Sequence, residues 1–156
     1  MDEKMVSLRI NDIPVTVPEG STVLEAARSA GFNIPSLCFL KDINEIGACR
    51  ICVVEVKGAK SLVASCVYPV AEGMEVYTNT ERVRKSRQLT LELILSNHPA
   101  MCQSCNRGST GCELKTLANT MDTEFANYAK NQEVITANQI MEIDDGISIM
   151  RDPNRC

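Results

Sequence analysis

The eight cysteines of this chain form two groups and leave one residue at the end, and the first group has the spacing of a metal-ligand set. Ten, two and thirteen residues separate its members, which are Cys38, Cys49, Cys52 and Cys66. Four thiolates complete the coordination of two tetrahedral irons that share two sulfides. The C-x2-C pair lets one turn of backbone present two sulfurs to one site, and the small residues Gly47 and Ala48 allow the backbone to come close. The spacing therefore predicts a 2Fe–2S cluster.

Two other kinds of thiol site stay open for this group. Four cysteines also bind structural zinc, although zinc ribbons usually carry two C-x2-C pairs and this group has one. A C-x2-C pair can also exchange disulfides, but such a pair lies at a helix N-terminus, whereas a β-rich run follows Cys52. The alternative of another class is therefore a zinc-stabilised structural or interaction module without a redox role.

The second group combines the only histidine of the chain with three cysteines: His98, Cys102, Cys105 and Cys112. A lone histidine is more often a solvent-facing residue than a ligand. A zinc site made of three cysteines and one histidine would use the same side chains. From the residues alone, these interpretations of the second group stay open.

Composition and charge narrow the class of protein. The N-terminus lacks an apolar run of signal-peptide length, and no apolar segment reaches about 18 residues, so a soluble, cytoplasmic protein is predicted. In a reducing compartment, thiols bind metals more often than they form disulfides. The net charge of −4 argues against a nucleic-acid binder. One basic run is predicted to be a solvated helix face, with docking of an acidic partner as the alternative: Arg82, Arg84, Lys85 and Arg87.

The elements that must position the first group are short strands and one helix. β-rich runs bounded by turn residues lie at 5–10, 14–18, 51–57, 61–66 and 74–78. A helix of about nine residues follows the capping box of Thr22 and Glu25, and Gly31 suits its C-terminal end. Its expected apolar face consists of Val23, Ala26, Ala27 and Ala30.

The order of these elements predicts an α+β fold, with a small mixed sheet and one helix packed across it. An irregular loop at 32–50 separates the helix from the third strand and carries Cys38 and Cys49. Loops of this length inside a compact domain are usually functional.

The second half of the chain is predicted to be helical at first. Apolar residues recur at helical spacing from Glu81 to a helix end near His98 and Pro99, namely Val83, Leu89, Leu93, Ile94 and Leu95. A second short helix is expected after Cys112, and a last short strand at 147–150.

The stretches IPSLCFLKDINEIGACRICVVEV and VASCVYPVAEGMEV contain the first cysteine group and resemble a known family. They are similar to the N-terminal 2Fe–2S domain of multi-cluster FeFe-hydrogenase catalytic subunits of the NAD(P)-linked type. The same domain opens the large iron–sulfur subunit of respiratory complex I and of some NAD-linked formate dehydrogenases. The resemblance implies a β-grasp, ferredoxin-like domain over residues 1–80, with its four ligands at Cys38, Cys49, Cys52 and Cys66.

In the resembling families, a small helical segment follows and binds a 4Fe–4S cluster through the pattern H-x3-C-x2-C-x5-C. Residues 81–121 would be this segment, and His98, Cys102 and Cys105 match its pattern. Cys112 matches in type but lies one residue late, in a glycine-containing stretch that can absorb the insertion. A neutral imidazole in place of a thiolate makes the cluster more positive, which is expected to raise its potential.

The terminal stretch ISIMRDPNRC is similar to the segment that leads, in these families, into a ferredoxin domain with two 4Fe–4S clusters. Residues 122–156 are therefore predicted to be a connector, and the chain is interpreted as the N-terminal portion of a larger protein. Cys156 alone cannot hold a cluster.

The resemblance implies an electron-transfer module that relays single electrons through one 2Fe–2S and one 4Fe–4S cluster, with no substrate chemistry of its own. Its expected partners are the remainder of a hydrogenase-type enzyme and a redox partner, either an NAD(P)H-linked flavin and iron–sulfur subunit or a ferredoxin. A parent of the complex I or formate dehydrogenase type is the alternative.

Overall fold

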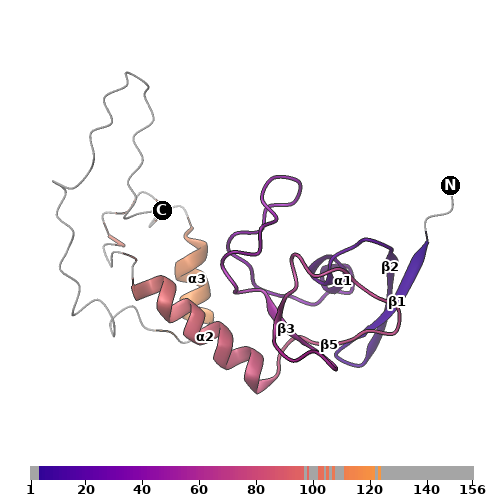
Figure 1. The fold of residues 1–156 in the computed structure, drawn as a ribbon. Coiled ribbons are helices and arrows are strands. Elements are labelled where there is room, and N and C mark those ends of the chain that lie inside the picture. Colours follow the sequence, from indigo (N-terminus) through magenta and orange to yellow (C-terminus); the bar gives the residue numbers. More distant parts are fainter. Residues whose placement is uncertain are drawn as a thin grey trace. The chain divides into compact units, whose positions relative to one another are not determined.

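The computed structural model describes residues 4–96 and 111–121, together with His98, Cys102, Gln103, Cys105, Arg107 and Thr123. The chain divides into two compact units, unit 1 at Met1–Thr90 and unit 2 at Leu91–Cys156 (Figure 1). The strand expected at 147–150 and nearly all of the connector expected at 122–156 lie outside the described residues. No helix among the described residues is long and apolar enough to cross a membrane.

Unit 1 contains the predicted mixed sheet. Its five strands are β1 (Met5–Ile10), β2 (Ile13–Pro18), β3 (Val53–Val56), β4 (Val63–Ala64) and β5 (Glu75–Tyr77). The order in the sheet is β2-β1-β5-β3-β4, in which β1 pairs with β5 in parallel and the other pairs are antiparallel. The α+β prediction is confirmed, and the last three strands are shorter than the sequence runs at 51–57, 61–66 and 74–78.

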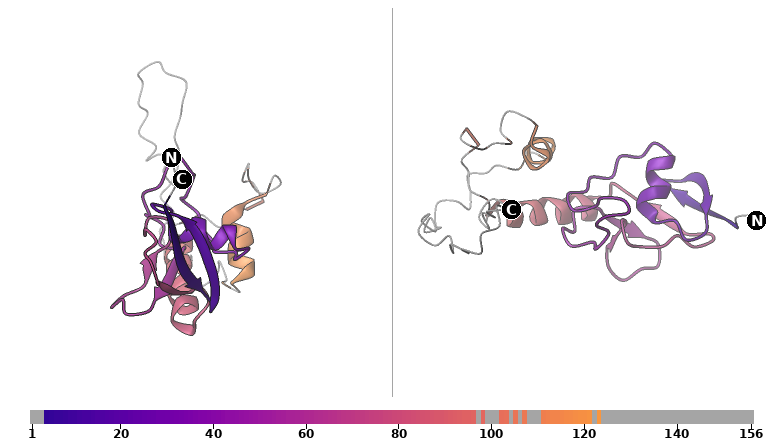
Figure 2. Two further views of the ribbon diagram at one scale, coloured as in Figure 1. Left: turned by 90° about the vertical axis from the view of Figure 1, so that its right-hand side faces the viewer. Right: turned by 90° about the horizontal axis from the view of Figure 1, so that it is seen from above.

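The hairpin of β1 and β2 forms one edge of this sheet and is the indigo pair in Figure 2. Alternate residues of β1 are buried, as expected for a strand with one face toward a core. Ile10 pairs with Ile13, so the loop holds only Asn11 and Asp12, whose φ angles are 47° and 66°. Positive φ at both central residues is the geometry of tight hairpin turns that match the twist of the strands.

The helix α1 (Val23–Ser29) has both predicted ends. The Thr22 hydroxyl accepts from the Glu25 amide, and the Glu25 carboxylate accepts from the Thr22 amide, which forms the capping box. At the other end, the amides of Gly31 and Phe32 bond back to Arg28 and Ala27, with Gly31 at φ 80°.

The apolar face predicted for α1 is partly wrong. Val23, Ala26 and Ala27 are buried, but Ala30 is exposed and Leu24 is fully buried instead. The helix ends at Ser29, so Ala30 leaves the helical periodicity. Its buried side packs into one hydrophobic cluster with the inner face of the sheet.

The helix α2 (Glu81–Ser96) ends close to the predicted position, and of its predicted apolar residues Val83 and Leu95 are buried. Leu89 and Leu93 are more than half exposed. The buried residues recur every fourth position instead, namely Val83, Arg87, Leu91 and Leu95. One of these four positions is therefore occupied by an arginine.

Unit 2 contains the second predicted short helix, α3 (Glu113–Thr120), which begins directly after Cys112. Ala118 is its buried residue, and the Thr123 amide bonds back to the Ala118 carbonyl. This hydrogen bond closes the helix over its last turn.

Candidate metal centre

The four cysteines of the first group lie in unit 1 as two adjacent pairs. The Sγ atoms of Cys52 and Cys66 are 3.3 Å apart, although thirteen residues separate them in the chain. In the other pair, the Cys49 amide donates to Cys38 Sγ at 3.4 Å. Cys52 and Cys66 are buried, whereas Cys38 and Cys49 are half-buried.

Pairing of β3 with β4 brings Cys52 and Cys66 together. Val53, directly after Cys52, pairs with Ala64, so the chain segments on either side of both cysteines run next to each other. The amide and the hydroxyl of Ser65 both donate to the Cys52 carbonyl, at 3.2 and 2.7 Å. These bonds fix the backbone next to both thiols.

Side chains of α1 hold the 32–50 loop that carries Cys38 and Cys49. Glu25 forms an ion pair with Lys41, whose Nζ lies 3.0 Å from Oε1. The Arg28 guanidinium lies over the Phe39 ring at 5.3 Å from its centroid and donates to Ser36 Oγ. Contacts on both sides of Cys38 thus anchor a loop that has little regular structure.

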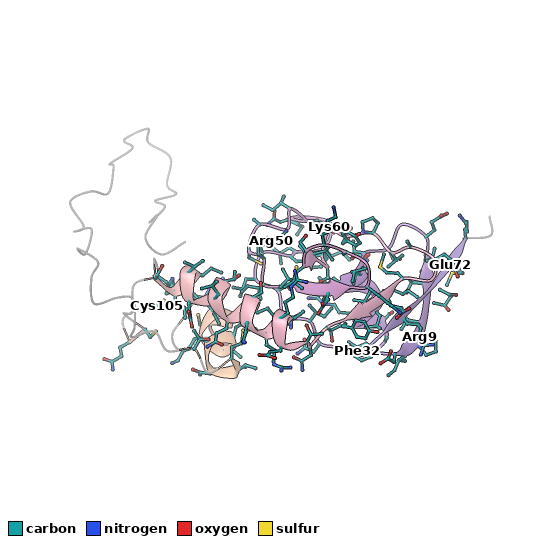
Figure 3. The ribbon with its side chains drawn as sticks, turned by 60° about the horizontal axis from the view of Figure 1, so that its bottom comes forward. Arg9, Phe32, Arg50, Lys60, Glu72 and Cys105 are labelled. Atoms are coloured by element: carbon teal, nitrogen blue, oxygen red, sulfur yellow. The ribbon has the colours of Figure 1, made fainter. Side chains whose placement is uncertain are left out.

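Within the loop itself, hydrogen bonds and left-handed residues set the path of the backbone. The side-chain amide of Asn44 donates from Nδ2 to the Cys38 carbonyl at 2.8 Å. Gly47 and Arg50 adopt φ angles of 62° and 57° on either side of Cys49. The left-handed conformation at Gly47 favours glycine, and a Cβ there would lie 3.0 Å from Val67 Cγ2, so that the Val67 side chain would have to shift. Arg50 and Lys60 lie at one end of unit 1, and Arg9 and Glu72 at the other (Figure 3).

The electrostatics of the four thiols favour a bound cation. Burial alone would raise the pKa of Cys49, but hydrogen bonds from the backbone of Ile51, Leu37 and Cys38 outweigh it and lower that pKa. Burial, followed by contact with Cys52 and the charges of the other cysteines, raises the pKa of Cys66 to about 12. Four thiolates therefore repel one another in this space unless positive metal ions lie between them.

The paired arrangement fits a 2Fe–2S cluster better than a single ion. Two thiolates bound at about 2.3 Å to one tetrahedral metal lie about 3.7 Å apart, close to the separation of Cys52 and Cys66. Each iron of a 2Fe–2S cluster takes only two protein ligands, whereas a structural zinc ion takes four. Throughout the described part of the chain, no three His, Cys, Asp or Glu side chains gather around one ion position.

The arrangement of Cys49 and Cys52 does not fit the alternative of disulfide exchange by a C-x2-C pair. Cys52 is adjacent to Cys66 rather than to Cys49, and the strand β3 follows it. The C-x2-C pair therefore does not lie in the first turn of a helix, where the activated thiolate of such redox pairs lies.

The second group lies in unit 2 with all four side chains half-buried: His98, Cys102, Cys105 and Cys112. The His98 amide bonds to the Leu95 carbonyl, which continues the last turn of α2, and Cys112 is the N-cap residue of α3. These four side chains do not form a single-ion site. Each iron of a 4Fe–4S cluster takes one protein ligand, so such a cluster does not require them to share one ion.

The basic run on α2 is only partly a solvated face. Arg82, Arg84 and Lys85 are exposed as predicted, but the prediction is wrong for Arg87, which is 6 % exposed. The regular four-residue spacing of Arg87 from Val83 and Leu91 is the sequence feature that could have indicated its burial.

Comparison with known families assigns a cluster type to each region. Residues 3–81 match the family described as "2Fe-2S iron-sulfur cluster binding domain". Residues 87–125 match the "NADH-ubiquinone oxidoreductase-G iron-sulfur binding region". The chain therefore combines a 2Fe–2S with a 4Fe–4S binding domain, as predicted.

Several curated proteins are similar over most of the chain. The NADP-reducing hydrogenase subunit HndD of Solidesulfovibrio fructosivorans is 38% identical over 97% of this chain and 28% of its own length. The NADPH-Fe(3+) oxidoreductase subunit alpha of Geobacter sulfurreducens is 37% identical over 97% of this chain and 17% of its own. The NADH-ubiquinone oxidoreductase 75 kDa subunit of Reclinomonas americana is 39% identical over 83% of this chain and 19% of its own length. The chain thus spans less than a third of the length of these relatives.

A solved structure agrees with these relatives. The crystal structure of an NAD+-reducing NiFe-hydrogenase in the H2-reduced state matches with a TM-score of 0.70 and 32% identity, over 76% of this chain and 50% of that chain. The predicted resemblance to hydrogenase and complex I-type subunits is confirmed, and the chain is an electron-transfer module of that kind. Because the first match covers half of its residues, the chain belongs to the 2Fe-2S iron-sulfur cluster binding domain family.

Proposed function

We propose that this chain relays single electrons through a 2Fe–2S cluster in unit 1 and a 4Fe–4S cluster in unit 2, as part of a hydrogenase-type enzyme. The proposed 2Fe–2S ligands are Cys38, Cys49, Cys52 and Cys66, and the proposed 4Fe–4S ligands are His98, Cys102, Cys105 and Cys112. The meeting of the first four cysteines as two pairs is the observation that supports the proposal most.

The pairs also suggest how the thiols are shared between the irons. Cys52 and Cys66 would bind one iron, and Cys38 and Cys49 the other. The cluster supplies a one-electron redox centre when bound. The chain contributes four anionic ligands, a buried environment on the side of Cys52 and Cys66, and backbone hydrogen bonds to Cys49.

In this proposal the 2Fe–2S domain comprises residues 1–80 and the 4Fe–4S segment residues 81–121, with residues 122–156 leading toward further clusters of the parent enzyme. The electron donor or acceptor is an NAD(P)H-linked flavin and iron–sulfur subunit or a ferredoxin, as expected for a relative of an NADP-reducing hydrogenase. We place the module in the cytoplasm, where its thiols stay reduced and available to iron.

A parent of the complex I type is the second candidate. The 75 kDa subunit of Reclinomonas americana and the second matched region, which carries the name of an NADH-ubiquinone oxidoreductase subunit, favour it. Electron exchange with a hydrogenase-type partner, compared with electron exchange with a quinone-linked partner, separates the two parents.

Iron analysis and spectroscopy of anaerobically purified protein test the relay. About six irons and six sulfides per chain are expected, with visible absorption that bleaches with dithionite and two EPR signals in the reduced protein. Cys52→Ser should lose about two irons and the 2Fe–2S signal, whereas Cys156→Ser, the matched control, should lose neither. A colourless protein that contains zinc would contradict the proposal.

A further inference from the structure

Arg87 is a cation inside unit 1 that has no carboxylate partner among the described residues. Its side chain is 6 % exposed and occupies a position between Val83 and Leu91 on the buried stripe of α2. The ion pairs of the neighbouring arginine and lysine, Arg82 with Glu55 and Lys85 with Glu81, lie on the exposed side of the helix. A buried charge without a counter-charge costs several kcal/mol, so a negative partner is expected.

The hydrogen bonds of Arg87 are incomplete. Nη2 donates to the Val53 carbonyl at 2.7 Å. Nε has no partner, and in the described part of the chain it is the one buried side-chain nitrogen or oxygen in that condition. A guanidinium has five N–H donors, so this contact leaves most of its donor capacity for another acceptor.

The negative group whose charge acts on the pKa of Arg87 is Cys52, one of the proposed cluster ligands. Burial lowers the pKa of Arg87 to about 10, and the charge of Cys52 opposes that shift. The guanidinium therefore stays cationic at neutral pH. Cys52 directly precedes Val53, whose carbonyl accepts from Nη2, so the hydrogen bond holds the guanidinium against the backbone next to this ligand.

We propose that Arg87 is the counter-charge of the 2Fe–2S cluster and raises its reduction potential; this inference rests on the proposed ligands. Two ferric irons, two sulfides and four thiolates sum to two negative charges, and addition of one electron to one iron makes three. A fixed neighbouring cation attracts the more negative form more strongly. Arg87 thus stabilises the reduced cluster more than the oxidised one.

The burial of Arg87 distinguishes its effect on the cluster from that of the exposed arginines of α2. The exposed arginines of the same helix are screened by water, so their charges act weakly on the cluster. Arg87 is enclosed and bonded to the residue that follows the buried Cys52, in a place where a charge acts at low effective dielectric constant. It is a positioning and tuning residue, because it acts on the cluster through charge and through the Val53 backbone.

The test compares charge-removing with charge-keeping substitutions in the cluster-loaded protein. Arg87→Gln and Arg87→Met should lower the midpoint potential of the 2Fe–2S cluster in an EPR-monitored titration with dithionite. Arg87→Lys should restore most of the difference. Arg84→Gln removes the same charge from the exposed side of α2, where Arg84 donates to the Asn79 carbonyl, and should leave the potential unchanged.

Each result decides the question. An unchanged potential in Arg87→Gln or Arg87→Met would overturn the proposal, as would equal shifts in Arg87→Gln and Arg84→Gln. If both neutral variants fail to retain the cluster, retention of the cluster by Arg87→Lys supports a requirement for the charge. Loss of the cluster from Arg87→Lys as well overturns the proposal. Wild-type protein without a 2Fe–2S signal would instead refute the proposed function itself.

Discussion

At the scale of single residues, the properties of both proposed clusters depend on a few side chains that differ from an all-thiolate, solvent-exposed site. In the proposed arrangement, His98 would bring a neutral ligand to the 4Fe–4S cluster, and the buried Arg87 would supply a cation to the 2Fe–2S cluster. Gly47 lets the backbone turn two residues before Cys49. Each of these residues leads to a separate measurement.

His98→Cys should keep four irons at the second site and lower the potential of that cluster by on the order of 100 mV. The new thiolate adds a negative charge, which penalises the more reduced form more strongly. An EPR-monitored redox titration measures the shift. The 2Fe–2S signal in the same sample is the internal control and should keep its potential; an unchanged 4Fe–4S potential would mean that His98 is not a ligand.

Gly47→Ala should destabilise unit 1 and reduce its iron content. The new Cβ would adopt a φ of 62° and crowd Val67 at 3.0 Å. Gly58→Ala is the matched control, because its φ is 85° but no atom lies within 4 Å of the added Cβ. Gly58→Ala should lower the free energy of unfolding by about 1 kcal/mol from conformation alone. Gly47→Ala should lower it clearly more, and anaerobic unfolding experiments measure both. Equal losses in the two variants would show that the contact with Val67 is unimportant.

At the scale of elements, α1 is the support for the 32–50 loop. Its capping box fixes the first turn, and its Glu25 and Arg28 side chains contact Lys41, Phe39 and Ser36 of the loop. Loss of the first turn is therefore expected to affect the loop as well as the helix.

Thr22→Ala should lower the stability of the protein by about 1 kcal/mol, because the Glu25 amide loses its acceptor. Thr22→Ser keeps the hydroxyl and should stay close to wild type. The midpoint of anaerobic thermal unfolding measures the difference. A Thr22→Ala protein as stable as Thr22→Ser would show that the cap contributes nothing.

The contribution of the cap also depends on pH. A hydrogen bond from the Thr22 backbone, followed by one from Lys41, lowers the pKa of Glu25 in the folded protein. The stabilisation from ionised Glu25 is therefore complete above the pKa of about 4.3 that Glu25 has in the unfolded chain. It is lost as the pH falls through the lowered pKa of the folded protein. Glu25→Gln should remove this part of the acid sensitivity.

At the scale of the whole molecule, the division into two compact units predicts that each cluster is retained independently. Cys105→Ser should lose the 4Fe–4S signal and keep the 2Fe–2S signal, and Cys52→Ser should do the reverse. EPR and iron counts on both variants measure this independence. Loss of both clusters in either variant would show that the units depend on each other for folding.

The relatives place such a module inside larger enzymes. The chain matches 28% of the length of a hydrogenase subunit and 19% of a complex I-type subunit. The region that this chain spans is therefore shared by a subunit of an NADP-reducing hydrogenase and a subunit of an NADH-ubiquinone oxidoreductase.

Much of unit 1 could be predicted from the sequence because the determinants are local. The capping box needs only Thr22 and Glu25, three residues apart, and the hairpin turn needs only Asn11 and Asp12 at positive φ. Spacing alone also indicated the first ligand group, since a C-x2-C pair and two further cysteines suit few metal centres. The ligand assignments themselves stay predictions.

Tertiary packing decided the features that local patterns do not encode. Cys52 and Cys66 meet because β3 pairs with β4, and Leu24 is buried where Ala30 was expected. On α2, hydrophobicity alone favoured burial of Leu89 and Leu93, but the stripe that contains Arg87 is the one that is buried. The physical reason is that burial depends on which face of the helix meets the rest of the fold, and Arg87 is enclosed where the Val53 carbonyl accepts a hydrogen bond from its guanidinium.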